Sequence, residues 1–157
     1  MSPWLVACLL LSVAISGAPA QSTIFIVRHA EKSDGTKDPD LSPAGRTRAE
    51  ALARVLKDAN ITAIYATEFR RTQETAAPLA RALGIEVTVV PAAATADLAT
   101  KLKTASGNAL LVGHSNTIPD LIKALGIATP LTLTEADYDN LFIVVLEENP
   151  RLLRLHF

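Results

Sequence analysis

The chain has 157 residues, with 15 basic and 16 acidic side chains and a net charge of -1 at pH 7. This balance creates no overall field that would favour nucleic acid or an anionic membrane, so any anion site must supply its own attraction. Residues 21–157 are enough for one domain with one core and too few for two. They contain no cysteine, which excludes a fold held together by disulfides.

The N-terminal segment carries no charged side chain over residues 1–20. Its apolar run, Trp4 to Ile15, is followed by the small residues Ser16–Ala20, and this pattern predicts a secretory signal peptide that is cleaved before Gln21. The mature protein is therefore expected in the periplasm or outside the cell. An uncleaved membrane anchor is the alternative, but the run is shorter than the ~20 residues needed to span a bilayer. Lipidation of Cys8 is disfavoured because the apolar run continues past it.

Short apolar runs alternate with amphipathic stretches along the rest of the chain, which predicts an α/β fold with a largely parallel sheet. The predicted strands, in chain order, are Thr23–Arg28, Thr62–Ala66, Glu86–Val90, Ala109–Gly113, Phe142–Leu146 and Leu152–Leu155. The last strand follows the turn-forming segment Glu148–Pro150, so it is expected to pair antiparallel with its predecessor as a hairpin.

Helices are predicted between these strands from their apolar stripes. They are expected to begin at Pro43, in the turn that holds Arg70 and Arg71, near Asp97 and near Ile118. Ser42 is the predicted N-cap of the first helix, with proline at the first helical position. Gly84 and Gly126 are predicted to end the second and the last helix. The polar segment Glu31–Asp40 is predicted to be a loop that borders the mouth of a site.

Basic side chains follow three of the predicted strands. Arg28 and His29 end the first strand, Arg70 and Arg71 follow the second, and His114 follows the fourth. Ligands of α/β proteins usually bind at the carboxyl ends of the strands, so this cluster predicts an anion site. Two histidines without supporting Asp or Cys side chains fall short of the usual three or four metal ligands. Neither a metal nor another cofactor is expected.

Four segments, in this order, resemble the histidine phosphatase superfamily, also called the phosphoglycerate mutase-like family. They are Arg28-His29-Ala30, with Ala where the family usually has Gly, Leu41–Gly45, Thr67–Thr75 and Val112–Asn116. The resemblance covers roughly residues 24–146. It implies a three-layer fold with a mostly parallel central sheet and helices on both faces. It also implies a phosphatase that hydrolyses phosphomonoesters or phosphohistidine.

The resemblance assigns roles to four residues of the basic cluster. It makes His29 the residue that is phosphorylated, and Arg28, Arg71 and His114 the residues that bind the phosphoryl oxygens. The residue types suit these roles, because a neutral imidazole can accept a phosphoryl group. A guanidinium stays charged and donates paired hydrogen bonds. Arg70 is expected to be a solvated helix residue.

The proton donor to the leaving group is not marked by a motif. Family members place an acid either directly after the second histidine or in the segment after the second arginine. Asn116 and Thr117 occupy the first of these places, so that version is absent. Asp97 lies at about the right distance for the second version and is the predicted general acid. The same residue also suits a helix N-cap, and Glu31 is the alternative donor.

Two other functions compete with this interpretation. Gly113–Thr117 imitates the nucleophile elbow of α/β-hydrolases, but it lacks the last glycine and is followed only by His156 as a possible partner. A non-enzymatic anion-binding or regulatory module on a degenerate phosphatase fold is suggested by Ala30 and by the unmarked acid. The short chain leaves little room for a cap insertion. A small phosphorylated substrate or, after export, a phosphorylated envelope component is the expected partner.

Overall fold

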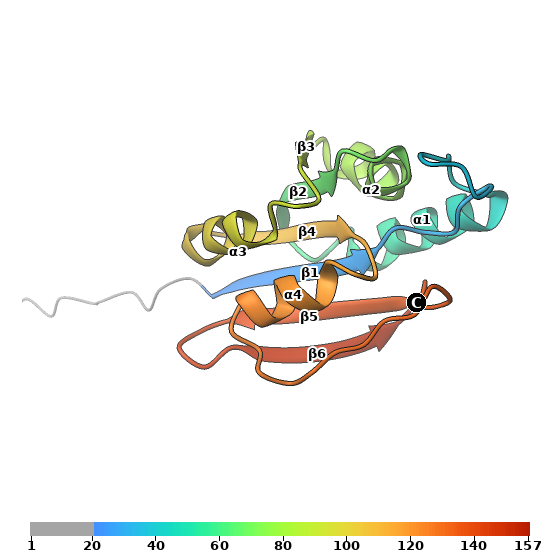
Figure 1. Cartoon of the computed structure of the whole chain (residues 1–157). Coiled ribbons are helices and arrows are strands. Elements are labelled where there is room, and N and C mark those ends of the chain that lie inside the picture. The colour runs from blue at the N-terminus through green and yellow to red at the C-terminus, as the bar shows by residue number, and fades with distance from the viewer. Residues whose placement is uncertain (1–20) are drawn as a thin grey trace, which may run out of the picture.

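The computed structural model describes residues 21–157, and the predicted signal peptide lies outside the described residues. One six-stranded sheet forms the centre, with the order β3-β2-β4-β1-β5-β6 (Figure 1). Its strands are β1 Ser22–Arg28, β2 Ile61–Thr67, β3 Val87–Val90, β4 Asn108–Gly113, β5 Asn140–Leu146 and β6 Arg151–His156. The strands from β3 to β1 are mutually parallel, whereas β5 and β6 join antiparallel. The predicted mostly parallel sheet and its terminal hairpin are confirmed.

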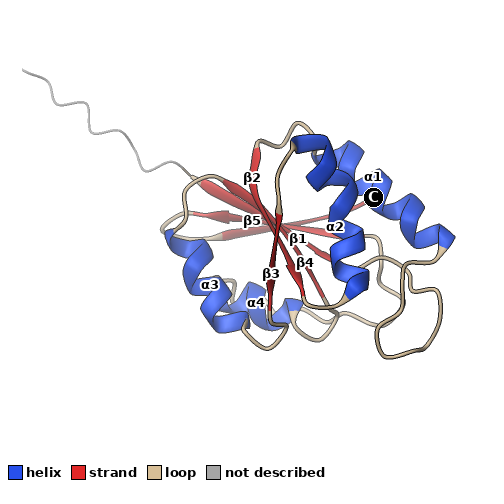
Figure 2. Cartoon of the chain, turned by 90° about the horizontal axis from the view of Figure 1, so that it is seen from above, coloured by secondary structure: helices blue, strands red, loops and turns tan. Residues whose placement is uncertain are grey.

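Four helices cover the sheet on both faces. They are α1 Pro43–Leu56, α2 Arg70–Leu83, α3 Thr95–Thr104 and α4 Ile118–Ala124. Figure 2 shows α1 and α2 on one side of the sheet and α3 and α4 on the other. Alternate residues of β1 follow the same division, since Ile24 and Ile26 pack with α3 and α4, whereas Val27 packs with α1 and α2. The expected three-layer architecture is therefore confirmed.

The start of α1 is anchored to the segment that follows β1. Ser42 is the N-cap as predicted, because its hydroxyl accepts a hydrogen bond from the Gly45 amide at 3.0 Å. A Cβ atom at Gly45 would lie 2.3 Å from the Glu31 carbonyl oxygen, so only glycine permits this approach. The Ser42 amide also donates to that carbonyl at 2.9 Å. These contacts hold in place the backbone just beyond His29.

Helix α3 departs from the prediction at its beginning. It begins at Thr95 with Ala94 as the N-cap, not at Asp97. A turn closed by the Ala94 amide and the Pro91 carbonyl at 2.9 Å carries the chain into the helix two residues early. Asp97 therefore lies inside the first turn, and its interpretation as the N-cap is wrong. None of the helices within residues 21–157 is long and apolar enough to cross a membrane.

Candidate active site

His29 and His114 meet because their strands are neighbours. β1 and β4 run parallel with Arg28 opposite Gly113, and the His29 amide extends this pairing by donating to the Gly113 carbonyl at 2.9 Å. Both histidines thus leave the same edge of the sheet side by side. Their ring centroids are 5.3 Å apart at an interplanar angle of 62°. Both side chains are buried.

His29 presents one nitrogen to the site. Its Nδ1 lies 2.8 Å from the Ala30 carbonyl oxygen, which can only accept, so Nδ1 carries the proton of the neutral ring. Within residues 21–157 no hydrogen bond engages Nε2, whose lone pair is free. Burial lowers the pKa of His29 to about 4, although the bond to Ala30 opposes this, and nearby Arg28 adds to the effect. A neutral imidazole with a free Nε2 is a competent nucleophile at pH 7.

Ala30 stands where the family usually has glycine, and the surrounding helices accommodate its methyl group. Its side chain is fully buried in a small cluster with Leu41 and Ala49. Its amide donates to the Thr75 hydroxyl of α2 at 2.9 Å. The backbone carbonyl that orients His29 is consequently fixed from both α1 and α2.

Arg28 is a buried cation held by the loop between α4 and β5. Its side chain is 2% exposed and donates to the Thr134 carbonyl at 3.1 Å and to the Glu135 carboxylate at 2.7 Å. The guanidinium stacks on the Tyr138 ring at 4.2 Å from its centroid. This combination of ion pair, hydrogen bond and cation–π contact compensates the burial of the charge.

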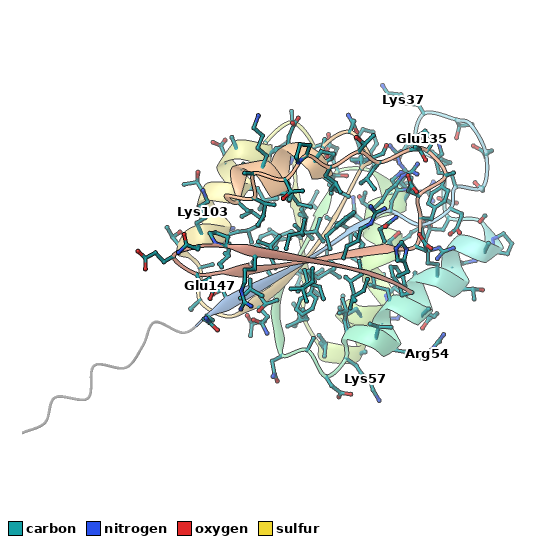
Figure 3. The ribbon with its side chains drawn as sticks, turned by 90° about the horizontal axis from the view of Figure 1, so that it is seen from below. Lys37, Arg54, Lys57, Lys103, Glu135 and Glu147 are labelled. Atoms are coloured by element: carbon teal, nitrogen blue, oxygen red, sulfur yellow. The ribbon has the colours of Figure 1, made fainter. Side chains whose placement is uncertain are left out.

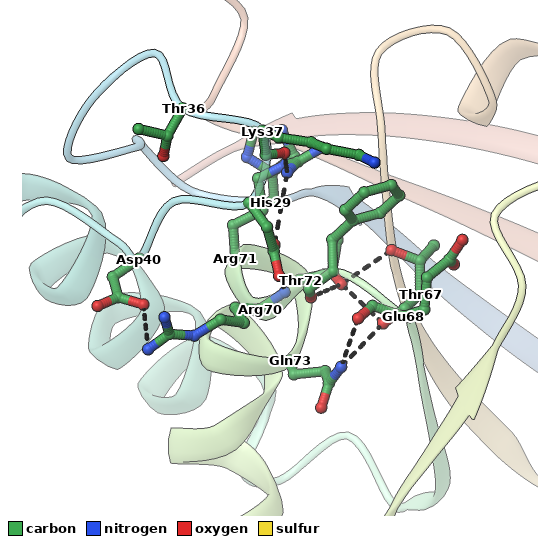
Figure 4. A network of polar contacts seen from close by, with 12 residues as sticks. His29, Thr36, Lys37, Asp40, Thr67, Glu68, Arg70, Arg71, Thr72 and Gln73 are labelled. Atoms are coloured by element: carbon green, nitrogen blue, oxygen red, sulfur yellow. Dashed lines mark hydrogen bonds and ion pairs between the residues drawn. The ribbon is translucent and has the colours of Figure 1, made fainter.

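Arg71 enters from the first turn of α2, and the loop Glu31–Asp40 borders it. Its guanidinium lies 4.4 Å from the Phe69 ring centroid. It donates to the Lys37 carbonyl at 3.4 Å (Figure 4) and lies 3.9 Å from the Asp38 carboxylate. These partners are distant compared with those of Arg28. Arg70, by contrast, is exposed and pairs with Asp40, as expected for a solvated helix residue.

Among the residues that the structure describes, each of the two arginines has one buried N–H group without a hydrogen-bond partner. The Nε atoms of Arg28 and Arg71 are buried and have no hydrogen-bond partner among residues 21–157. An unpaired buried N–H group is costly, so such groups in a protein call for an explanation. An anion that reaches either atom would satisfy it. The structure therefore brings together the four residues predicted for the phosphate site, His29, Arg28, Arg71 and His114.

His114 lies against the end of β2 and the residues that lead into α2. Its Nε2 lies 2.8 Å from the Thr67 hydroxyl, and its ring meets the Phe69 ring edge-on at 5.2 Å. Burial, followed by the charge of Arg71, lowers the pKa of His114 to about 4. The side chain is therefore neutral at pH 7 in the absence of a bound anion.

The two predicted proton donors do not join this cluster. Asp97 is exposed on the first turn of α3, and its side chain makes no hydrogen bond within residues 21–157. Glu31 accepts three hydrogen bonds from Arg48, at 2.7, 2.9 and 3.0 Å, which tie the segment after His29 to α1. Burial acts against the charge of Glu31, but the hydrogen bonds from Arg48 prevail and lower its pKa. Asp97 as the general acid stays a prediction.

Glu135 is an acidic neighbour of the site that sequence reasoning missed. Its carboxylate bridges Arg28 and the Ser115 hydroxyl, the latter at 2.6 Å, while its side chain is 74% exposed. Figure 3 places it at the same end of the molecule as Lys37. The hydrogen bond from Ser115 and the charge of Arg28 lower the pKa of Glu135, so it is ionised. No motif marks this loop, and only the tertiary structure reveals the contact.

The nucleophile elbow finds no support in this geometry. The Ser115 hydroxyl is bonded to a carboxylate, and within residues 21–157 no histidine is hydrogen-bonded to it, so the nucleophile elbow has no triad. His156 instead pairs with Asp139 at 3.2 Å. No three His, Cys, Asp or Glu side chains in the described part of the chain gather in an arrangement that could hold a metal ion.

The fold and this cluster define an α/β protein with two histidines and two arginines gathered at the carboxyl edge of its sheet. Residues 24–97 match the model of the histidine phosphatase superfamily (branch 1). This part of the chain, from β1 to the first turn of α3, therefore carries the sequence pattern of that superfamily.

Curated relatives match over part of their length. Phosphoserine phosphatase 1 of Hydrogenobacter thermophilus is 37% identical over 71 residues, which are 41% of this chain and 34% of the relative. An uncharacterized protein of Mycobacterium tuberculosis is 38% identical over 69 residues, again 34% of its length. The chain thus spans about a third of the length of the curated relatives it matches.

Solved structures share the fold across nearly their whole length. The protein histidine phosphatase SixA complexed with tungstate has a TM-score of 0.68 at 20% identity, covering 85% of this chain and 96% of SixA. A mycobacterial glucosyl-3-phosphoglycerate phosphatase has a TM-score of 0.66 at 18% identity, covering 84% of this chain and 97% of that one. Likeness at this level of identity concerns the architecture alone.

Proposed function

We propose that this protein is a phosphatase that works through a phosphohistidine intermediate on His29. The observation that carries the proposal is a neutral histidine with a free Nε2 beside two arginines whose buried Nε donors are unpartnered. A nucleophile of this kind needs fixed positive charge around the three equatorial oxygens of a transferring phosphoryl group. Arg28 and Arg71 supply that charge from two different elements.

The reaction proceeds in two displacements. His29 Nε2 attacks phosphorus, a P–N bond forms, and the bond to the leaving oxygen breaks as that oxygen gains a proton. Water then attacks the phosphorus, the P–N bond breaks, and inorganic phosphate and neutral His29 are released. Arg28, Arg71 and His114 bind the phosphoryl oxygens throughout, so that the charge developing on them is stabilised in a buried site.

The decisive experiment compares His29→Ala with the intact protein on p-nitrophenyl phosphate. Loss of the nucleophile should lower turnover by at least about 1,000-fold. His156→Ala is the matched control, because this exposed histidine of β6 contacts Asp139 and not the pocket. Mass spectrometry after rapid quenching without acid should find phosphate on His29. Near-normal turnover by His29→Ala would refute the proposal.

The proton donor is tested separately with Asp97→Asn. A missing donor slows a poor leaving group most, and general acids typically contribute about 100- to 10,000-fold. If Asp97 is the donor, the variant should hydrolyse an alkyl phosphate far more slowly while keeping its rate on p-nitrophenyl phosphate. Asp120→Asn is the control, since Asp120 is the acidic residue in the first turn of α4. Unchanged rates on both substrates would leave the enzyme with another donor or with substrates that need none.

One observation favours the second candidate, a non-enzymatic anion-binding module. The Glu135 carboxylate already forms an ion pair with Arg28. Such a permanent partner is expected for an arginine that no longer binds substrate. p-Nitrophenyl phosphate separates the two candidates, because its good leaving group requires little acid assistance. Binding of phosphate without any turnover of this compound would favour the module.

Substrate and location complete the proposal. The positive charge of Arg28 and Arg71 suits a small phosphorylated compound, a phosphorylated envelope component or phosphohistidine. The N-terminal sequence supports export to the periplasm or beyond, with cleavage before Gln21. N-terminal sequencing of the exported protein tests the location, and an intact Met1 would contradict it. A panel of phosphorylated compounds tests the substrate.

A further inference from the structure

A chain of buried hydroxyl groups leads away from His114. Its Nε2 lies 2.8 Å from the Thr67 hydroxyl, which lies 2.9 Å from the Thr72 hydroxyl. The Thr72 hydroxyl in turn lies 2.7 Å from the Phe69 carbonyl oxygen and 3.0 Å from the Thr67 carbonyl oxygen (Figure 4). All three side chains are buried. The chain therefore ends inside the protein on groups that can only accept.

The two carbonyls set the direction of every bond in this chain. Thr72 has one hydroxyl proton, and it must point to a carbonyl, because two oxygens at 2.7 Å without a proton between them repel. Thr72 then accepts from Thr67, whose only proton is spent in that bond. Thr67 must accept from His114, so the proton of the neutral His114 ring sits on Nε2.

The opposite nitrogen of His114 is consequently a bare lone pair. Within residues 21–157 no hydrogen bond engages Nδ1. An anion oxygen that approaches this nitrogen meets lone-pair repulsion unless a proton lies between the two atoms. His29 has the reverse tautomer, with Nδ1 protonated by its bond to the Ala30 carbonyl.

We propose that Thr67 and Thr72 are positioning residues that hold His114 as its Nε2–H tautomer, so that a tetrahedral anion enters the site together with one proton on His114 Nδ1. The proposal rests on the phosphate site proposed above. The proton comes either from a monoanionic phosphate or from solvent, moves to Nδ1, and is then donated in a hydrogen bond to an anion oxygen. The bound state therefore contains an imidazolium, and the free state does not.

The charges around His114 agree with this exchange. Arg71, Arg28 and His29 face the ring and oppose its protonation, whereas Glu68 and Glu135 favour it. Burial is the largest influence and lowers the pKa of His114 to about 4 in the free protein. A bound dianion adds negative charge next to the ring, which raises the pKa and makes proton uptake favourable.

Sulfate is the probe of choice, because it is a tetrahedral dianion that carries no proton between about pH 5 and 8. Calorimetric titration of the His29→Ala variant in two buffers of different ionisation enthalpy counts the protons taken up, with His114 as the only histidine left in the pocket. We expect uptake of about one proton per sulfate and an affinity that falls about tenfold per pH unit. Nuclear magnetic resonance of the ring nitrogens of the ligand-free protein should show His114 as the Nε2–H tautomer.

Two valine substitutions in this background separate the proposal from a purely structural role. Thr67→Val removes the acceptor for Nε2–H, and Thr72→Val lets Thr67 turn its own proton toward His114. Either change permits the Nδ1–H tautomer, so sulfate should bind with less than about half a proton and a shallower pH dependence. Thr67→Ser should restore the full uptake. Thr100→Val is the control, since its exposed hydroxyl on α3 bonds only the Ala96 carbonyl.

The outcomes distinguish this inference from the proposed function. Full proton uptake in both folded valine variants, or an Nδ1–H tautomer of His114 in the unsubstituted protein, overturns the role of the hydroxyl chain. If none of the variants binds sulfate although the tautomer is as expected, the anion site is overturned and the tautomer assignment stands. The resonance measurement decides the tautomer even where a substituted protein does not fold.

Discussion

Arg28 and Arg71 both lie close enough to His29 and His114 to lower their pKa values, but the surroundings of the two arginines differ. Arg28 ends a strand of the sheet, and the loop between α4 and β5 gives it a carboxylate, a carbonyl and an aromatic ring. Arg71 begins a helix, and its nearest carboxylate, that of Asp38, is 3.9 Å away. Both arginines are predicted to bind the phosphoryl oxygens, but the protein balances the charge of Arg28 more completely than that of Arg71.

Because of this difference, the two arginines should contribute unequally to the stability of the protein. The charge of Arg28 is balanced before any ligand arrives, so its side chain also ties the loop to the sheet. The charge of Arg71 is balanced mainly by the Phe69 ring and the distant Lys37 carbonyl, so a bound anion should stabilise this charge more than that of Arg28. The first arginine is thus expected to matter for folding and chemistry, and the second chiefly for chemistry.

The largest expected effect is on turnover. Arg28→Ala and Arg71→Ala should each lower kcat/KM for p-nitrophenyl phosphate by about 100- to 1,000-fold, because each removes fixed charge from the transition state. Only Arg28→Ala should also destabilise the protein, by about 1–2 kcal/mol, through the lost bonds to Thr134 and Tyr138. Kinetics and thermal denaturation measure both. Arg70→Ala is the control and should stay within about twofold; an unchanged melting temperature in Arg28→Ala would break the comparison.

The next effect is on stability in mild acid. The pKa values of His29 and His114 are lowered from 6.5 to about 4, so the unfolded chain binds more protons than the folded one between these values. Stability should therefore fall as the pH drops from about 6.5 towards 4, by up to about 3 kcal/mol per histidine. Urea denaturation at pH 7 and pH 5 measures the loss. His29→Asn should roughly halve this loss of stability. A loss as large as that of the unsubstituted protein would contradict the lowered pKa of His29.

A smaller effect should follow from making the surroundings of the two arginines alike. Glu135→Gln removes the carboxylate beside Arg28, so phosphate should bind about 2- to 5-fold more tightly at low salt, with less gain at high salt. Inhibition by inorganic phosphate measures the change. Glu147→Gln, at the opposite end of the molecule (Figure 3), is the control. Weaker phosphate binding in Glu135→Gln would place Glu135 among the groups that help to hold the anion.

The smallest effect is a difference in titration. Among the charges, Arg28 acts most strongly on the pKa of His29, and Arg71 acts most strongly on that of His114. Arg28→Ala should therefore raise the pKa of His29 more than that of His114, and Arg71→Ala should do the reverse. Titration of the two rings by nuclear magnetic resonance reads both directions. Equal shifts in both variants would show that the arginines do not divide the pocket between them.

The amino-acid sequence by itself determined the elements and their polar ends. Short apolar runs and helical stripes are local properties, so β1 to β6 and the cap at Ser42 were predictable from neighbouring residues alone. The positions of Arg28, His29, Arg71 and His114 at element ends followed from the same patterns. The start of α3 did not, because a turn through Pro91 and Ala94 overrides the signal at Asp97.

The tertiary structure alone decided which of these ends meet and what surrounds them. Strand order is a long-range property. Because β4 lies between β2 and β1 in the sheet, Thr67, His114 and His29 lie at the same edge. Glu135 comes from a loop without regular periodicity, so its contact with Arg28 exists only once the loop has packed on the sheet. The tautomers of the two histidines depend on acceptors brought in by folding, Ala30 for one and Thr67 for the other. Local sequence carries the chemical groups, whereas their charges and protons are set by neighbours that only the packed chain supplies.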